Sequence, residues 1–123
     1  MDIETRKQAG IQVLKLRGSI KLGEPVDQLL QTMDSLIGSG DTQVVANLAE
    51  VPTADSSGIG ALVRYHTSLK QRGGALKLVS PSNFLVQTLK VLGLYSIFEV
   101  FENEQAAVQS FTSQSTFGQA VNR

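Results

Sequence analysis

The sequence predicts a single α/β domain in which a small mixed β-sheet of about five strands packs against about four helices. Short segments with the apolar pattern of strands alternate along the chain with longer segments whose apolar residues recur every third or fourth position. The chain has 123 residues, which is enough for one hydrophobic core and too few for two ordinary domains. We therefore expect a sheet with a parallel portion and helices on at least one of its faces.

The first third of the chain predicts a hairpin followed by a helix. Residues 11–20 (IQVLKLRGSI) alternate apolar and polar side chains as a half-buried strand does, and the strand is expected to end near Gly18. The preceding segment can pair with it through a turn at residues 9–10, and its low apolar content suits an edge strand. From Pro25 the spacing predicts a helix with proline in its first turn, ended by GSGD at 38–41.

The middle of the chain predicts two further strands with a helix between them. Residues 42–48 (TQVVANL) are typical of a central strand because their apolar side chains run together, and residues 75–79 (ALKLV) form the next strand. The intervening helix begins in the segment ADSSGIGALV at 54–63 and stops at RGG, residues 72–74. Its apolar stripe consists of Ile59, Leu62, Val63, His66 and Leu69.

The last third predicts a helix, a short strand and a final helix. Ser82 or Asn83 can cap a helix that runs to about Leu94, FEVFEN at 98–103 contains a short strand, and a last helix covers residues 104–111. The domain is expected to span residues 1–112, with a polar, loosely held tail over residues 113–123. The inward face of the helix after Ser82 is expected to consist of Leu85, Leu89 and Leu92. That of the last helix is expected to consist of Ala107, Val108 and Phe111.

Composition excludes several classes of function. Eleven basic and eleven acidic side chains give a net charge of zero, so nothing favours nucleic acid or an anionic membrane as a partner. The absence of cysteine excludes disulfides, thiol catalysis and cysteine-ligated metals. No segment has the apolar run of a signal peptide or the roughly 20 apolar residues of a membrane span, so we expect a cytoplasmic protein without membrane association.

The segment ADSSGIGALV places two glycines in the first turn of its predicted helix, where each costs about 1 kcal/mol relative to alanine. Ser56 or Ser57 can be the N-cap of this helix, or can carry a phosphate beside the positive end of the helix dipole; both can hold in turn. Capping leaves Gly58 and Gly60 unexplained. We therefore expect that a partner protein approaches the backbone closely at this turn.

Catalysis has no candidate group of residues. The single histidine, His66, is separated from Ser56 by ten helical residues, or about 15 Å at a rise of about 1.5 Å per residue, so a nucleophile–base pair is not expected. No glycine pattern matches a phosphate-binding loop, and no carboxylates lie at metal-ligand spacing with the histidine. We expect no enzyme activity, no metal and no cofactor, and a histidine that has a structural role or is partly exposed.

Residues 47–94 carry a family resemblance. The segment NLAEVPTADSSGIGALVRYHTSLKQRGGALKLVSPSNFLVQTLKVLGL resembles the STAS domain of bacterial anti-sigma factor antagonists, and nearly the whole chain follows the same order of elements. The resemblance implies a small mixed sheet packed against helices. That fold agrees with the order of elements predicted from periodicity alone.

The resemblance also implies a mechanism called partner switching. The unphosphorylated antagonist binds an anti-sigma factor that is also a serine kinase, phosphorylation by that kinase separates the two, and a serine phosphatase restores the antagonist. Ser56 matches the phosphorylated position of the family, and the surrounding contact surface matches Asp55, Ser57, Gly58, Ile59 and Gly60.

This chain departs from the family pattern after its second strand. Such antagonists typically carry glycine, two residues and an aspartate that contacts the kinase, whereas GSIK places Lys21 at the last position. Lys21 is therefore expected on the partner-binding surface, at the same end of the molecule as Ser56. A lysine at this position is expected to change which partner the protein binds. An alternative function is a stand-alone STAS subunit of a transporter or other assembly that uses the same surface without phosphorylation.

Overall fold

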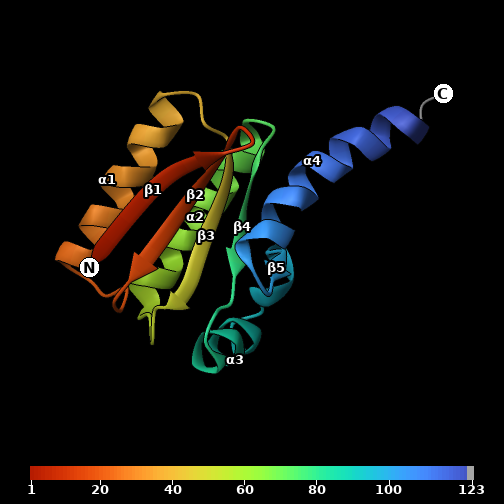
Figure 1. The fold of residues 1–123 in the computed structure, drawn as a ribbon. Coiled ribbons are helices and arrows are strands. Elements are labelled where there is room, and N and C mark those ends of the chain that lie inside the picture. Colours follow the sequence, from red (N-terminus) through yellow and green to blue (C-terminus); the bar gives the residue numbers. More distant parts are fainter. Residues whose placement is uncertain (122–123) are drawn as a thin grey trace.

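A computed structural model describes the backbone of residues 1–121 and the side chains of residues 1–112. Its centre is a five-stranded sheet with the order β1-β2-β3-β4-β5 (Figure 1). The first two strands form an antiparallel hairpin, and the later strands run parallel to β2, as the sequence predicts. The strands are β1 (Asp2–Gln8), β2 (Ile11–Arg17), β3 (Gln43–Glu50), β4 (Ala75–Val79) and β5 (Val100–Phe101).

Helices cover both faces of this sheet. Helices α1 and α2 pack on one face and α4 on the other, while α3 lies at one end (Figure 1). None of the described helices is long and apolar enough to cross a membrane. The helices are α1 (Glu24–Gly38), α2 (Ser56–Gln71), α3 (Asn83–Val91) and α4 (Glu104–Val121), with a 3₁₀ turn, η1 (Tyr95–Ile97), between α3 and β5.

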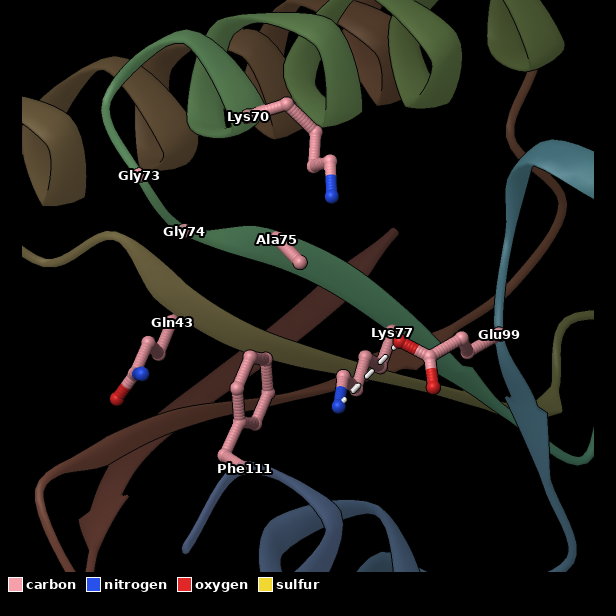
Figure 2. Close-up of a pocket in the computed structure, with 8 residues that line it drawn as sticks. All are labelled: Gln43, Lys70, Gly73, Gly74, Ala75, Lys77, Glu99 and Phe111. Atoms are coloured by element: carbon pink, nitrogen blue, oxygen red, sulfur yellow. Dashed lines mark ion pairs between the residues drawn. The ribbon is translucent and has the colours of Figure 1, made fainter. Parts of the chain in front are cut away.

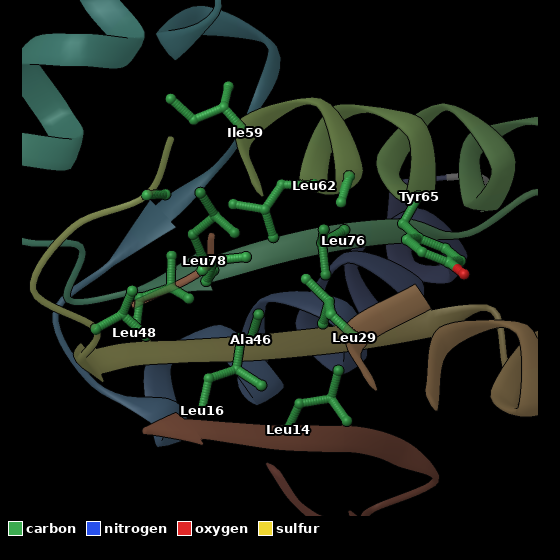
Figure 3. Close-up of a cluster of buried hydrophobic side chains, with 14 of the residues drawn as sticks. Leu14, Leu16, Leu29, Ala46, Leu48, Ile59, Leu62, Tyr65, Leu76 and Leu78 are labelled. Atoms are coloured by element: carbon green, nitrogen blue, oxygen red, sulfur yellow. The ribbon is translucent and has the colours of Figure 1, made fainter. Parts of the chain in front are cut away.

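Alternation along the strands divides the core in two. In β2, Leu14 and Leu16 point into the larger cluster under α1 and α2, whereas Val13 points into the smaller cluster under α4. Figure 3 shows the larger cluster, with Leu62 and Tyr65 of α2 above the strands. Each helix thus buries its apolar stripe against one face, which explains why helical and strand periods alternate in the sequence.

Two helix ends differ from the sequence prediction. Helix α3 ends at Val91 and Leu92 is 53% exposed, so this leucine belongs to the surface rather than to the inward face. Helix α4 continues to Val121, although an end near Phe111 was predicted from the loss of apolar periodicity. Periodicity reports only the buried stripe, so it gives no signal where a helix passes beyond the sheet. Of the predicted tail, residues 122–123 lie outside the described residues, and a domain boundary at residue 112 stays a prediction.

Candidate functional site at the start of helix α2

Two loops meet at the carboxyl ends of β2 and β3. Ile20, after β2, forms a parallel bridge with Ala54, after β3. The Ile20 amide donates to the Thr53 carbonyl at 3.1 Å, and the Asp55 amide donates to the Ile20 carbonyl at 3.2 Å. These bonds fix the β2–α1 loop against the turn that begins α2. The structure thereby places the segment containing Lys21 beside the segment containing Ser56, as the sequence predicts.

Asp55 is the N-cap of α2 and also ties the two loops together. Its Oδ1 accepts from the Gly58 amide at 2.9 Å, and its Oδ2 accepts from the Leu22 amide at 2.9 Å. The bond from Leu22 is the main cause that lowers the pKa of Asp55, followed by the bond from Gly58. The prediction that Ser56 or Ser57 caps the helix is wrong, because the carboxylate one residue earlier takes this position.

The two serines after Asp55 differ in exposure. Ser56 is the first residue of α2 and is exposed, whereas Ser57 is half-buried. Within the described part of the chain, the Ser56 hydroxyl takes part in no side-chain hydrogen bond, because the cap is supplied by Asp55. Of the two hydroxyls, that of Ser56 is therefore the more accessible to an enzyme.

The two glycines of the motif have different surroundings. Gly58 is buried, and a Cβ atom on it would lie 2.1 Å from the carbonyl oxygen of Ile20. The backbone that approaches Gly58 is therefore the chain's own, not that of a partner. Gly60 is exposed, and a Cβ atom there would meet nothing within 4 Å. Ile59 between them is 3% exposed and belongs to the core.

Exposed residues around this turn define what we call the α2 N-terminal surface: Lys21, Asp55, Ser56 and Gly60, with half-buried Ser57 among them. The positive charge of Lys21 acts on the Asp55 carboxylate and helps to lower its pKa. Leu22, the next residue, is 75% exposed. This surface therefore combines two hydroxyls with one charge of each sign, and an exposed leucine lies beside it in the neighbouring loop.

His66 lies away from this surface, ten residues after Ser56 along α2, which is nearly three helical turns. Its ring packs against Phe98 with the ring centroids 5.1 Å apart. Burial lowers the pKa of His66, and its Nδ1 is buried without a hydrogen-bond partner. The histidine is therefore part of the packing beneath α2, as predicted, and does not assist Ser56.

A second feature, a pocket of about 330 Å³, lies at the other end of the sheet (Figure 2). It is lined by Lys70, Lys77, Glu99 and Phe111 among others. Among the residues that the structure describes, no cluster of three or more His, Asp or Glu side chains could hold a metal ion. The ionisable side chains in the lining of this pocket are Lys70, Lys77 and Glu99.

Lys77 is a buried cation that the sequence analysis did not single out. Its Nζ donates to Ser110 Oγ at 2.7 Å, lies 3.4 Å from Glu99 Oε2, and sits 4.0 Å from the centroid of the Phe111 ring. Because Ser110 and Phe111 belong to α4, Lys77 attaches that helix to β4. The signal in the sequence is the charge between Leu76 and Leu78, in a strand buried on both faces.

The chain belongs to the STAS domain family, whose model matches residues 2–107. An anti-sigma F factor antagonist of Paenibacillus polymyxa is 24% identical over 109 residues, which cover 88% of this chain and 92% of that protein. The family model thus covers the sheet, the α2 N-terminal surface and the start of α4.

Solved structures of similar proteins have the same fold. An anti-sigma-factor antagonist (STAS) domain protein of Planctomyces limnophilus has a TM-score of 0.79 at 23% identity, covering 91% of this chain and 99% of that one. The Bacillus cell fate determinant SpoIIAA in its phosphorylated form has a TM-score of 0.73 at 20% identity, covering 89% and 99%. The family and fold inferred from the sequence are confirmed.

Proposed function

We propose that this protein is an anti-sigma factor antagonist that works by partner switching and has no catalytic activity of its own. Its unphosphorylated form binds an anti-sigma factor with serine kinase activity through the α2 N-terminal surface. Phosphorylation of Ser56 by that kinase releases it, and a serine phosphatase restores binding. The observation that carries the proposal is the exposed Ser56 hydroxyl, free of capping because Asp55 caps α2.

The surroundings of Ser56 explain how a phosphate there would act. The fold tolerates the group because it projects from the positive end of a helix into solvent. The same group adds about two negative charges next to Asp55, which the hydrogen bonds from Leu22 and Gly58 keep ionised. A partner that had contacted a neutral hydroxyl would have to desolvate these charges, at a cost of several kcal/mol.

This cost is large enough to operate a switch. Because about 1.4 kcal/mol corresponds to a tenfold change in affinity, a cost of about 3 kcal/mol weakens binding roughly a hundredfold. Gly58 and Ile59 contribute from beneath the surface by holding the turn in place, whereas Lys21, Asp55, Ser57 and Gly60 can contact the partner directly.

The decisive experiment captures partners from lysate with the unmodified full chain, then incubates the retained kinase with the protein and ATP and locates the phosphate by mass spectrometry. We expect modification on Ser56, release of the modified protein, and loss of release in Ser56→Ala. Ser57→Ala is the matched control and is expected to accept phosphate normally. Modification on Ser57 alone, or full binding by protein stoichiometrically phosphorylated on Ser56, would contradict the proposal.

The same experiment distinguishes the alternative function. A stand-alone STAS subunit of a transporter or other assembly would be retained by its partners with or without ATP, and neither serine would become modified. In that case Ser56→Glu would affect binding only as an ordinary contact residue.

A further inference from the structure

Strand β1 leaves one long edge of the sheet without a neighbouring strand. It stands first in the sheet order and pairs on one side with β2 (Figure 1). The opposite edge is formed by β5, which is two residues long. An unpaired edge presents backbone N–H and C=O groups that can continue the ladder with another strand. Nothing else in the described fold offers an edge of seven residues.

The charges of β1 are complementary to those of a second copy of the same strand. The strand reads DIETRKQ, with acids before Thr5 and bases after it. When a strand pairs antiparallel with its own copy, residues at equal distances from the centre face each other. With Thr5 at the centre, Glu4 of each copy faces Arg6 of the other. We propose that two copies of this chain pair in this way through β1, forming one continuous sheet around a two-fold axis at Thr5.

The charges also select this register over its neighbours. Side chains alternate between the two faces of a strand. A two-fold axis perpendicular to the sheet places residues of the same face opposite each other. The axis must therefore pass through a residue position, and neighbouring registers differ by a shift of the axis by one whole residue. With the centre at Glu4, two glutamates would face each other, and with the centre at Arg6, two arginines would do so. Like charges directly opposite are destabilising. Only the arrangement centred on Thr5 places opposite charges together twice without also placing like charges directly opposite each other.

Both charged residues of the proposed contact already form ion pairs within one copy of the chain. Glu4 pairs with Arg17, which also approaches Glu50, and Arg6 pairs with Glu104. Across the proposed contact these pairs join into one row of alternating sign: Glu50, Arg17 and Glu4 of one copy, then Arg6 and Glu104 of the other. The side chains of Glu4 and Arg6 are 62% and 49% exposed, so a second copy can reach them.

The other face of β1 leaves room beside the edge. A groove of about 390 Å³ runs between β1 and α1 and is lined by Ile3, Thr5, Gln31, Thr32, Ser35 and Leu36. In a two-fold arrangement the grooves of the two copies face each other across the new strand pair. The contact uses none of the residues of the α2 N-terminal surface.

Sedimentation analysis of the full chain, from low to high micromolar concentration, tests the inference. We expect a monomer–dimer equilibrium, weakened roughly tenfold or more by Glu4→Arg or by Arg6→Glu, because each variant turns two attractive pairs into two repulsive ones. The double variant Glu4→Arg/Arg6→Glu restores complementary charges and is expected to dimerise again. Thermal melts followed by circular dichroism verify that each variant is folded.

A mixture of the two single variants gives the sharpest test. One variant then carries bases at positions 4 and 6 and the other carries acids, so an equimolar mixture is expected to form a heterodimer more tightly than either variant dimerises alone. A wild-type chain that stays monomeric throughout overturns the inference. A dimer that is insensitive to the single variants, or a mixture without heterodimer, overturns it as well.

Discussion

The carbonyl oxygen of Ile20 lies where a side chain on Gly58 would begin, 2.1 Å from the position of its Cβ atom. This carbonyl also accepts the Asp55 amide at 3.2 Å, so it cannot turn away without breaking the junction of the two loops. Glycine at position 58 is thus required by the packing of the chain itself. Gly60, two residues on, has open space where its side chain would be.

We predict opposite effects of alanine at these two glycines. Gly58→Ala forces the Ile20 backbone to move and lowers the free energy of unfolding by about 3 kcal/mol. Gly60→Ala adds a methyl group in open space within a helix and raises it by about 0.5–1 kcal/mol. Denaturant titrations of both variants measure the two changes. Equal destabilisation by both would contradict this account of the turn.

Periodicity was sufficient to predict the order of the strands and helices, because one face of each helix and alternate residues of each strand are buried. It could not identify the cap of α2. Asp55, Ser56 and Ser57 are adjacent and all have side chains that can cap a helix. Which of them is the cap depends on the Leu22 amide, which comes from another loop and donates to Asp55. Close approaches such as that of Ile20 to Gly58 are likewise tertiary contacts that no local pattern records.

Because the Asp55 carboxylate is ionised in its cap, the stability of the turn at the start of α2 is expected to depend on acidic pH. Its pKa is below the ordinary value of 3.8 in the folded protein, because the Leu22 and Gly58 amides bind the ionised form. A lowered pKa means that this contribution to stability is fully present above about pH 3.8 and is lost as the pH falls through the lowered value. Asp55→Asn keeps a capping oxygen without the charge.

We therefore predict that Asp55→Asn is less stable than the wild type at neutral pH and that the difference shrinks below pH 3.8. Thermal melting across this range measures it. Glu102→Gln, the same change of carboxylate to amide at an exposed residue after β5, is the matched control. A difference between Asp55→Asn and the wild type that is independent of pH would show that the charge has no part in the cap.

His66 is expected to make the stability of the protein depend on pH in a second, higher range. Burial lowers its pKa from 6.5 in the folded protein, so below pH 6.5 the unfolded chain binds a proton that the folded protein resists. The stability associated with His66 is thus present above pH 6.5 and is lost as the pH falls towards its lowered pKa.

We predict that the free energy of unfolding declines as the pH falls below 6.5 in the wild type and much less in His66→Gln, which cannot take up a proton. Because His66 is the only histidine, a single imidazole signal in an NMR titration reports its pKa directly. A titration midpoint at or above 6.5 would contradict the effect of burial.

Lys21 stands where the resemblance described in the sequence analysis leads us to expect an aspartate, and the structure places it beside the start of α2. Lys21 is exposed, adjoins Ile20 and Leu22 in the loop tied to Asp55, and brings a positive charge to a surface whose other charge is a carboxylate. Charges at the rim of an interface affect the choice of partner and the rate of association more than the final affinity.

We predict that Lys21→Asp changes which anti-sigma factors bind, with relative affinities across a panel of related kinases shifting by about tenfold in either direction. The reversed charge favours kinases that present a basic group opposite this loop, and it disfavours those that present an acid. The variant is expected to fold normally, because the lysine makes no ion pair with another described residue.

Lys70→Asp makes the same change of charge near the far end of α2 and is the control for net charge. Binding titrations at two salt concentrations separate the local effect from screening. The same rank order of kinases for wild type, Lys21→Asp and Lys70→Asp would show that Lys21 does not select the partner.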